Sequence, residues 1–161
     1  MMDIVIREAT LADQEGLFLL YAEIDALHHE AMPDTFRTTE EIARPSNFLV
    51  ERLADEKIHL YVAEAADRLA GMILLKPKTQ KHPLFYTQDY LHISTLIVAA
   101  DFQGQGVAQL LLNTAVTFAK ERELTQINLN VYEFNQRAIA FYEKEGFNTG
   151  KREMWLNLEE I

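Results

Sequence analysis

The chain has 161 residues, a length typical of one domain, and we predict a single domain over residues 1–161. Its hydrophobic content of 48% is enough for a sizeable core, and the absence of cysteine excludes disulfides, thiolate metal sites and a catalytic thiol. The net charge of −10 disfavours nucleic acid as a partner. Because the sequence shows neither an apolar run of membrane-spanning length nor a signal-peptide pattern, we expect a cytoplasmic protein without a membrane partner.

Periodicity in the first third of the chain predicts a short strand and two helices. Residues 3–7 alternate in polarity as a strand does, and a cap at Thr10 or Asp13 begins a helix that Pro33 ends. The apolar residues of this helix recur at helical spacing; they are Leu17, Leu20, Tyr21, Ile24 and Leu27. Residues 39–55 predict a second helix with an irregularity at its proline.

The middle of the chain predicts three strands in succession. Two apolar segments, residues 58–65 and 69–76, are separated by Ala66-Asp67-Arg68, which predicts a hairpin turn. Residues 79–83 are polar and predict a loop, and residues 90–98 are rich in the β-branched side chains that favour a strand.

The last third of the chain alternates between helices and strands. An apolar stripe predicts a helix over residues 104–122, followed by a strand over 127–132 and a helix over 135–145 that Gly146 caps. Residues 154–158 predict a last strand. The order β-α-α-β-β-β-α-β-α-β indicates an α/β (α+β) fold with a mixed central sheet of about six to seven strands flanked by helices, parallel where a helix crosses over.

A glycine-containing turn, Gln103-Gly104-Gln105-Gly106-Val107-Ala108, lies between a predicted strand and a predicted helix. Glycine allows backbone to approach a ligand closely, and the first N–H groups of a helix have no internal partner, so this turn is suited to bind a pyrophosphate. The turn lacks the Gly-Lys-Ser/Thr of a P-loop and the third glycine of a dinucleotide-binding turn. A tight strand-to-helix connection without a ligand is the alternative.

Together with a second segment, Asn135 to Phe147, this turn resembles the two signatures of the GCN5-related N-acetyltransferase (GNAT) family. The first signature, Gln/Arg-x-x-Gly-x-Gly/Ala, is matched at Gln103, Gly106 and Ala108. The second, Asn-x-x-Ala-x-x-Phe-Tyr-Glu-Lys-x-Gly-Phe, is matched at Asn135, Ala138, Phe141, Tyr142, Glu143, Lys144, Gly146 and Phe147. The order of predicted elements also looks like the GNAT fold over nearly the whole chain.

The resemblance implies acetyl-CoA as co-substrate and an N-acetyltransferase in which an amine attacks the thioester directly. It implies that strands 90–98 and 127–132 splay apart to admit the pantetheine arm. The residues implied to bind the donor are three on a strand, the six of the glycine turn and one at a helix start: Leu96, Ile97, Val98, Gln103, Gly104, Gln105, Gly106, Val107, Ala108 and Asn135.

Two side chains are candidates for proton transfer. Tyr142 matches the family position whose phenol often donates a proton to the departing thiolate, and packing in the core is the alternative role. The position of the glutamate base of some family members is Ser94 here, and serine is a poor base. His92, two residues earlier on that strand, is a candidate base because histidine can be neutral at physiological pH. A merely packed His92, Glu64 as the base, and water as the base are the alternatives.

Acceptor recognition is expected near the first helix. Residues 23–30 are acidic and suited to a cationic amine such as a polyamine or an aminoglycoside, or they form an exposed helix face. We expect a small-molecule amine rather than a protein as acceptor. The adjacent His28 and His29 do not face one site, so we predict no metal.

We expect residues 78–87, with Phe85 and Tyr86, to have one of three roles. They line the acceptor pocket, cover a sheet edge or form a homodimer contact. A non-catalytic acyl-CoA-binding or regulatory module with the same fold is the alternative to an enzyme.

Overall fold

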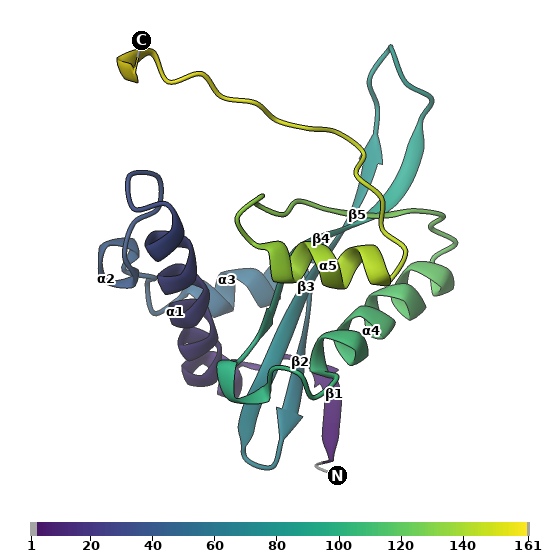
Figure 1. Cartoon of the computed structure of the whole chain (residues 1–161). Coiled ribbons are helices and arrows are strands. Elements are labelled where there is room, and N and C mark those ends of the chain that lie inside the picture. Colours follow the sequence, from purple (N-terminus) through teal and green to yellow (C-terminus); the bar gives the residue numbers. More distant parts are fainter. Residues whose placement is uncertain (1–2, 161) are drawn as a thin grey trace. The chain divides into compact units, whose positions relative to one another are not determined.

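The computed structural model describes residues 3–160, which form two compact units, one up to Asn130 and one from Val131. The first unit contains a sheet of five strands in the order β1-β2-β3-β4-β5 (Figure 1). The strands are β1 (Ile4–Glu8), β2 (His59–Ala65), β3 (Arg68–Gln80), β4 (Gln88–Val98) and β5 (Ile127–Leu129). Neighbours are antiparallel except β4 and β5, which are parallel as predicted for strands joined through a crossover helix.

The first unit also contains four helices, and the second unit contains one. They are α1 (Gln14–Ala31), α2 (Thr39–Ile42), α3 (Phe48–Ala54) and α4 (Val107–Glu121) in the first unit and α5 (Gln136–Lys144) in the second. Short 3-10 turns cover Leu11–Asp13, Ala100–Phe102 and Leu158–Glu160. No helix within residues 3–160 is both long and apolar enough to span a membrane.

The helices α1 and α4 cover opposite faces of the sheet (Figure 1). On one face, α4 packs so closely that a Cβ on Gly71 of β3 would lie 3.1–3.2 Å from side-chain atoms of Leu111 and Val107. On the other, a Cβ on Gly16 of α1 would lie 2.9 Å from Leu69. The core between these layers is aliphatic, and its largest fully buried side chains are Leu17, Leu20, Leu49, Met72, Ile73, Leu74, Leu75, Leu91, Leu111, Val62 and Val107.

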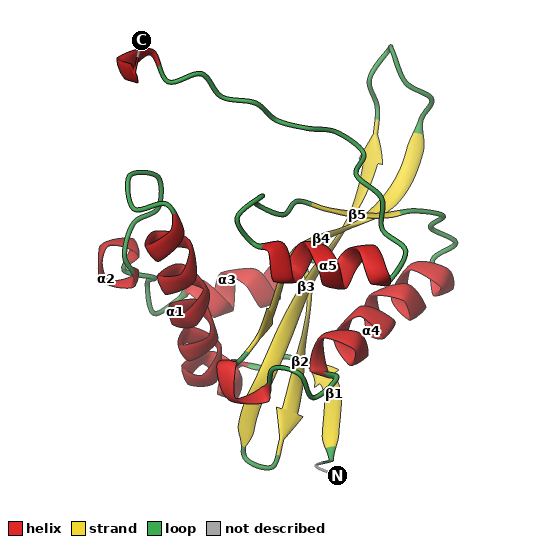
Figure 2. Cartoon of the chain, viewed as in Figure 1, coloured by secondary structure: helices red, strands yellow, loops and turns green. Residues whose placement is uncertain are grey.

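The structure corrects the predicted strand count, because the described residues form five strands rather than six to seven. The strand predicted over 154–158 is absent: residues 145–157 contain neither helix nor strand, and Leu158 begins a 3-10 turn (Figure 2). Met154, Trp155 and Leu156 are consecutive apolar residues without the alternation of a half-buried strand, and they are exposed by 84%, 88% and 73%.

Two further boundaries were predicted wrongly. The helix predicted over 39–55 is two helices, because Ala43 ends α2 in a left-handed conformation with φ of 43° and Pro45 follows. The polar residues 79–80 belong to β3 rather than to a loop, since Thr79 pairs with Asp89 of β4 and donates a hydrogen bond to its carboxylate. The hairpin loop is therefore residues 81–87 (Figure 2).

Candidate functional site

The strands β4 and β5 part after three residue pairs. Pairing runs from Leu91 with Ile127 to Ile93 with Leu129, where β5 ends, whereas β4 continues to Val98. Leu96, Ile97 and Val98 therefore pair with β3 on one side and lie beyond β5 on the other. Their outward backbone groups provide a strand edge on which an extended amide-containing chain can form hydrogen bonds.

A β-bulge marks the point at which the strands part. Leu75 of β3 pairs with Ile93 of β4 and the adjacent Leu74 pairs with Thr95, so Ser94 is an extra residue without a partner on β3. A bulge bends its strand and increases the local twist, which turns β4 away from β5. Sequence periodicity predicted neither the bulge nor the end of β5 at Leu129.

The glycine turn leads from β4 into α4. Gly104 and Gly106 have φ of 76° and 83°, in the left-handed region that glycine adopts without strain. The carbonyl of Gly106 accepts the first hydrogen bond of α4, which the Leu110 N–H donates. The N–H groups of α4 before Leu110 therefore have no partner within this 15-residue helix. A Cβ on either glycine would meet nothing within 4 Å, so the turn is open to a ligand. This geometry fits an anion.

Three contacts hold the turn in shape. The Ala100 N–H donates to a carboxylate oxygen of Glu23 from α1 at 2.8 Å, and the side-chain amide of Gln105 donates to the Asp101 carbonyl at 2.8 Å. Arg68 lies over the ring of Phe102, which is buried beneath the turn. The turn is therefore fixed before a ligand arrives, which lowers the entropy that binding must overcome.

His92 lies at the strand junction with its ring fixed by one hydrogen bond. Its Nδ1 is 2.8 Å from Oδ1 of Asn128, the residue with which it pairs on β5. An amide oxygen can only accept, so Nδ1 carries the proton and the lone pair of Nε2 remains available. Burial lowers the pKa of His92, with Lys78 and Lys76 adding to that effect and the bond to Asn128 opposing it. A neutral ring with a free Nε2 is the form that accepts a proton.

The other two candidates for the base are placed less favourably. Ser94 occupies the bulge, and its hydroxyl remains a poor base. Glu64 lies on β2, with β3 between it and β4, and its carboxylate accepts a hydrogen bond from Arg7 Nε at 2.7 Å. Glu64 is therefore held by Arg7 and lies on a strand that is not adjacent to β4, which disfavours it as the base.

The second unit holds Tyr142 in a well-defined helix end. Gly146, at φ of 92°, donates its N–H to the Glu143 carbonyl, and the Phe147 N–H donates to the Tyr142 carbonyl at 2.9 Å. This is the hydrogen-bond pattern of a Schellman motif, and its apolar contact is that of Phe147 with the Tyr142 ring at 5.4 Å between centroids. Gly146 is thus the predicted helix cap, and the spacing Tyr-x-x-x-Gly-Phe is a helix terminus that fixes the tyrosine.

The chemistry of two residues in this unit follows from their surroundings. Desolvation by burial raises the pKa of Tyr142 to about 12, so its phenol is protonated at neutral pH and can donate. Asn135 caps α5, its Oδ1 accepting a hydrogen bond from the Ala138 N–H at 3.1 Å. The Asn-x-x-Ala of the sequence is therefore a helix start, and its side-chain amide nitrogen is not used by that cap.

The acetyltransferase (GNAT) family model matches residues 21–147, which include β4, the glycine turn, α4 and α5. The chain belongs to the GNAT acetyltransferase family. Its similarity to the peptidyl-lysine N-acetyltransferase YjaB of Salmonella typhimurium is 36% identity over 95% of this chain and 90% of that protein. The predicted family and the predicted enzyme class, an N-acetyltransferase, are thereby confirmed.

Solved structures agree with this membership. The BH1408 protein of Bacillus halodurans, as a tetramutant, superimposes with a TM-score of 0.89 and 25% identity, over 96% of this chain and 99% of that one. An aminoglycoside N-acetyltransferase solved in complex with CoA shares the fold with a TM-score of 0.72 at 13% identity, over 98% of this chain and 95% of that one. The GNAT-like fold predicted from the element order is confirmed.

In this GNAT chain, several polar residues expected to meet the acceptor have structural partners. Glu23 accepts a hydrogen bond from the Ala100 N–H, in the 3-10 turn that precedes the glycine turn, and the buried Asp25 accepts two hydrogen bonds from Arg44, one of them from Nη2 at 2.9 Å. His28 Nδ1 is 2.8 Å from the Ile24 carbonyl, and His29 Nδ1 is 2.7 Å from the Phe36 carbonyl. Much of the polar character of residues 23–30 therefore supports the fold.

Residues 3–160 contain no group of three or more histidine or acidic side chains positioned to hold a metal ion. The loop at the end of the β3–β4 hairpin carries Leu84, Phe85 and Tyr86, exposed by 83%, 62% and 98%. The three roles predicted for this loop, namely an acceptor contact, the cover of a sheet edge and a homodimer contact, stay predictions.

Proposed function

We propose that this GNAT enzyme transfers an acetyl group from acetyl-CoA to a primary amine by direct attack of the amine on the thioester. The observation that carries the proposal is the free edge of β4 beyond the bulge, which continues into an open helix start at Gly106. The edge offers hydrogen bonds to the amides of a pantetheine arm, and the helix start offers N–H donors to a pyrophosphate. The match of the family model on both sides of residue 130 supports a single acetyltransferase domain over residues 1–161.

The donor-binding residues of this proposal are the edge residues Leu96, Ile97 and Val98, the turn from Gln103 to Ala108, and Asn135. Backbone N–H groups rather than side chains hold the phosphates, because the glycines place main chain at the surface of the turn. The amide nitrogen of Asn135 is available to the donor while its oxygen caps α5.

The proton transfers are assigned to His92 and Tyr142. His92 Nε2 takes one proton from the acceptor ammonium and releases it to solvent, and the resulting amine nitrogen forms a bond to the acetyl carbonyl carbon. The nitrogen of the tetrahedral adduct then loses a second proton to His92 Nε2, which leaves the neutral amide. As the carbon–sulfur bond breaks, the Tyr142 hydroxyl donates its proton to the departing thiolate. The neutral His92 ring and the protonated Tyr142 phenol support these roles. Exchange of protons with solvent then restores both side chains to their starting protonation states.

The acceptor class is proposed to be a small-molecule amine. The net charge of −10 favours a cationic amine over an anionic partner. The name of the YjaB relative makes a lysine side chain in a protein the alternative acceptor. Both contain the same nucleophile, so a panel of amines is needed to separate them.

The donor half is tested by thermal unfolding with acetyl-CoA, and the transfer by release of free CoA with a panel of amines. At about 100 times its Kd, acetyl-CoA should stabilise the protein by about 2.7 kcal/mol. The panel contains free lysine, a peptide with an internal lysine, a polyamine and an aminoglycoside. Absence of a thermal shift would contradict acetyl-CoA as donor, and a shift without CoA release on any amine would favour the non-catalytic alternative.

A further inference from the structure

Paired positions of β3 and β4 form a polar ladder on one face of the hairpin that these strands make. The pairs of this ladder are Lys76 with His92, Lys78 with Tyr90 and Gln80 with Gln88. Paired residues of antiparallel strands point to the same face, and every second position repeats that face, so these side chains lie together. The intervening pairs, Leu75 with Ile93 and Pro77 with Leu91, face the other way. The polar ladder therefore starts at the candidate base, His92.

The polar ladder begins where α1 stops covering the sheet. Gly71 of β3 faces α4, so Met72, Leu74 and Lys76 alternate on the opposite face, which is the face that α1 covers. Met72 and Leu74 are exposed by 0% and 1%, whereas Lys76 is half-buried and Lys78 is exposed. In Figure 1 the end of the hairpin extends beyond both α1 and α4. An acceptor can therefore reach the ladder from solvent.

The polar ladder carries positive charge and no carboxylate. None of the ion pairs among residues 3–160 involves Lys76 or Lys78. Both ammonium groups are close enough to His92 to lower its pKa, and no acidic side chain contributes to that shift. Asp89, the only acid in the two paired segments, lies on the other face, where Thr79 donates a hydrogen bond to it. In a chain of net charge −10, the ladder is thus a local positive site.

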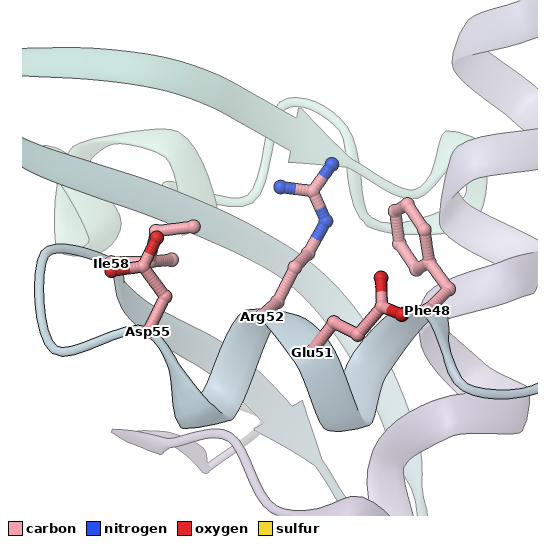
Figure 3. Close-up of a pocket in the computed structure, with 5 residues that line it drawn as sticks. All are labelled: Phe48, Glu51, Arg52, Asp55 and Ile58. Atoms are coloured by element: carbon pink, nitrogen blue, oxygen red, sulfur yellow. The ribbon is translucent and has the colours of Figure 1, made fainter.

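A pocket of about 310 Å³ beside α3 has the opposite balance of charge (Figure 3). It is lined by Phe48, Glu51, Arg52, Asp55 and Ile58, and in Figure 3 the Arg52 side chain rises from α3 beside the Phe48 ring. Its carboxylates outnumber its guanidinium, so it does not favour an anion. Of these two places, the polar ladder is the one suited to an anion.

We propose that Lys76 and Lys78 bind a carboxylate of the acceptor while its amine meets His92. This inference rests on the proposed acetyl transfer and narrows the acceptor to amines that also carry a carboxylate. Such an acceptor keeps the cationic amine that the acidic chain favours. As cross-strand partners, Lys76 and His92 have Cβ atoms about 5 Å apart, and Lys78 lies one ladder step, about 7 Å, further along the strand. Amino carboxylates with a short aliphatic chain between the two groups fit this spacing.

The experiment compares amino carboxylates with their uncharged amides. Acetyl transfer to γ-aminobutyrate, to ε-aminocaproate and to the amide of each is measured at about pH 8, where the His92 ring is neutral. The unmodified protein should have a KM about fivefold lower for each acid than for its amide, the size expected for partly exposed ion pairs. Lys76→Gln and Lys78→Gln should each reduce this preference, and the double variant should abolish it. The KM for acetyl-CoA should not change.

Two control variants locate the effect. Lys120→Gln removes an exposed ammonium group from the last turn of α4 and should keep the preference for acids. Arg52→Gln removes the cation of the pocket beside α3 and should also keep it. Loss of the preference in Arg52→Gln would place the carboxylate in that pocket and overturn the proposal.

The outcomes for the subsite and for the acetyl transfer are separable. Equal KM values for acids and amides in the unmodified protein would overturn the subsite and leave acetyl transfer in place. If no amine is acetylated, the proposed function fails, and thermal unfolding with CoA then tests the subsite alone. A stabilisation by ε-aminocaproate over its amide that the double lysine variant lacks would support the subsite, and absence of that difference would overturn it.

Discussion

At the scale of single residues, the strongest constraint on chemistry is a hydrogen bond between neighbouring strands. Asn128 presents its amide oxygen to His92 Nδ1, which matches the tautomer with the proton on Nδ1 and the lone pair on Nε2. The assignment of His92 as the base therefore depends on a residue of a different element. Sequence reasoning did not single out Asn128, although a polar side chain between Ile127 and Leu129 of an apolar strand is a recognisable signal.

Replacement of Asn128 should change the pH dependence of the enzyme. Asn128→Asp places a carboxylate beside Nδ1, which favours the imidazolium and should move the acid limb of kcat/KM upward by about one pH unit. In the unmodified protein that limb should lie below the ordinary histidine value of 6.5, because burial lowers the pKa of His92 and protonation removes the base. The measurement is a kcat/KM profile between pH 5 and about 8.

Two controls accompany this profile. Asn113→Asp adds the same charge on an exposed residue of α4 and should leave the limb in place. His92→Ala should abolish the limb, and an unchanged limb in that variant would reject His92 as the base.

Tyr142→Phe should lower kcat by about a hundredfold and leave the affinity for acetyl-CoA unchanged, because only the proton donor is lost. The ring contact with Phe147 is kept, so the helix end should persist. The measurements are steady-state kinetics and acetyl-CoA binding by calorimetry. Unchanged turnover would assign Tyr142 to packing alone.

At the scale of elements, two glycines of this chain serve different purposes. At Gly71 a Cβ would lie 2.6 Å from the carbonyl oxygen of Ile97 and within 3.2 Å of two α4 side chains. At Gly106 a Cβ would meet nothing within 4 Å, but the φ of 83° strains any other residue. The first glycine permits packing between β3, β4 and α4, and the second permits the turn.

Alanine at these two positions should separate stability from donor binding. Gly71→Ala should cost about 1–3 kcal/mol of unfolding free energy through overpacking, with the acetyl-CoA KM of the folded fraction unchanged. Gly106→Ala should cost about 1–2 kcal/mol through strain and also raise the acetyl-CoA KM, because the methyl group enters the open side of the turn. Urea unfolding and steady-state kinetics give both quantities. An unchanged KM for Gly106→Ala would contradict phosphate binding at the turn.

The elements show why sequence predicted some features and not others. Helix α4 and the hairpin of β2 and β3 have strong periodicity and turn residues, and they were found within a few residues of their ends. The end of α2 depends on a left-handed Ala43, and the bulge at Ser94 depends on pairing with β3; neither is encoded in local periodicity. The segment at 154–156 is apolar, yet no strand pairs with it among residues 3–160. Apolar character alone does not specify a strand.

At the scale of the whole molecule, one ion-pair network joins β1 to the 3-10 turn that follows it and to β2. Arg7 of β1 donates to Asp13 through both terminal nitrogens at 2.8 Å and to Glu64 of β2 through Nε. The hydrogen bond from Arg7 is the main reason that the pKa of Asp13 is lowered, and the Thr10 N–H adds to it. The stability of the folded state therefore depends on pH through the buried Asp13.

Acid should weaken the first unit through Asp13. A lowered pKa in the folded state means that this carboxylate contributes stability above its ordinary value of 3.8, and that the contribution is lost as pH falls through the lower folded value. Asp13→Asn should therefore be less stable than the unmodified protein at pH 7 and closer to it at about pH 3. Urea unfolding followed by far-UV circular dichroism measures both. Glu64→Gln, at a more exposed carboxylate, should cost less at pH 7; equal losses would assign the effect to Arg7 alone.

The extended segment near the C-terminus determines how such unfolding can be observed. The only tryptophan of the chain is Trp155, which is 88% exposed and belongs to the second unit. Its indole fluorescence therefore reports the solvent around that segment, and the aliphatic core around β3 is invisible to it. The emission of Trp155 would therefore stay unchanged during denaturation even when the sheet unfolds completely. A tryptophan in place of the buried Phe118 of α4 would report on the first unit, and its transition can be compared with that of far-UV circular dichroism, since coincidence of independent probes is the usual criterion of two-state behaviour.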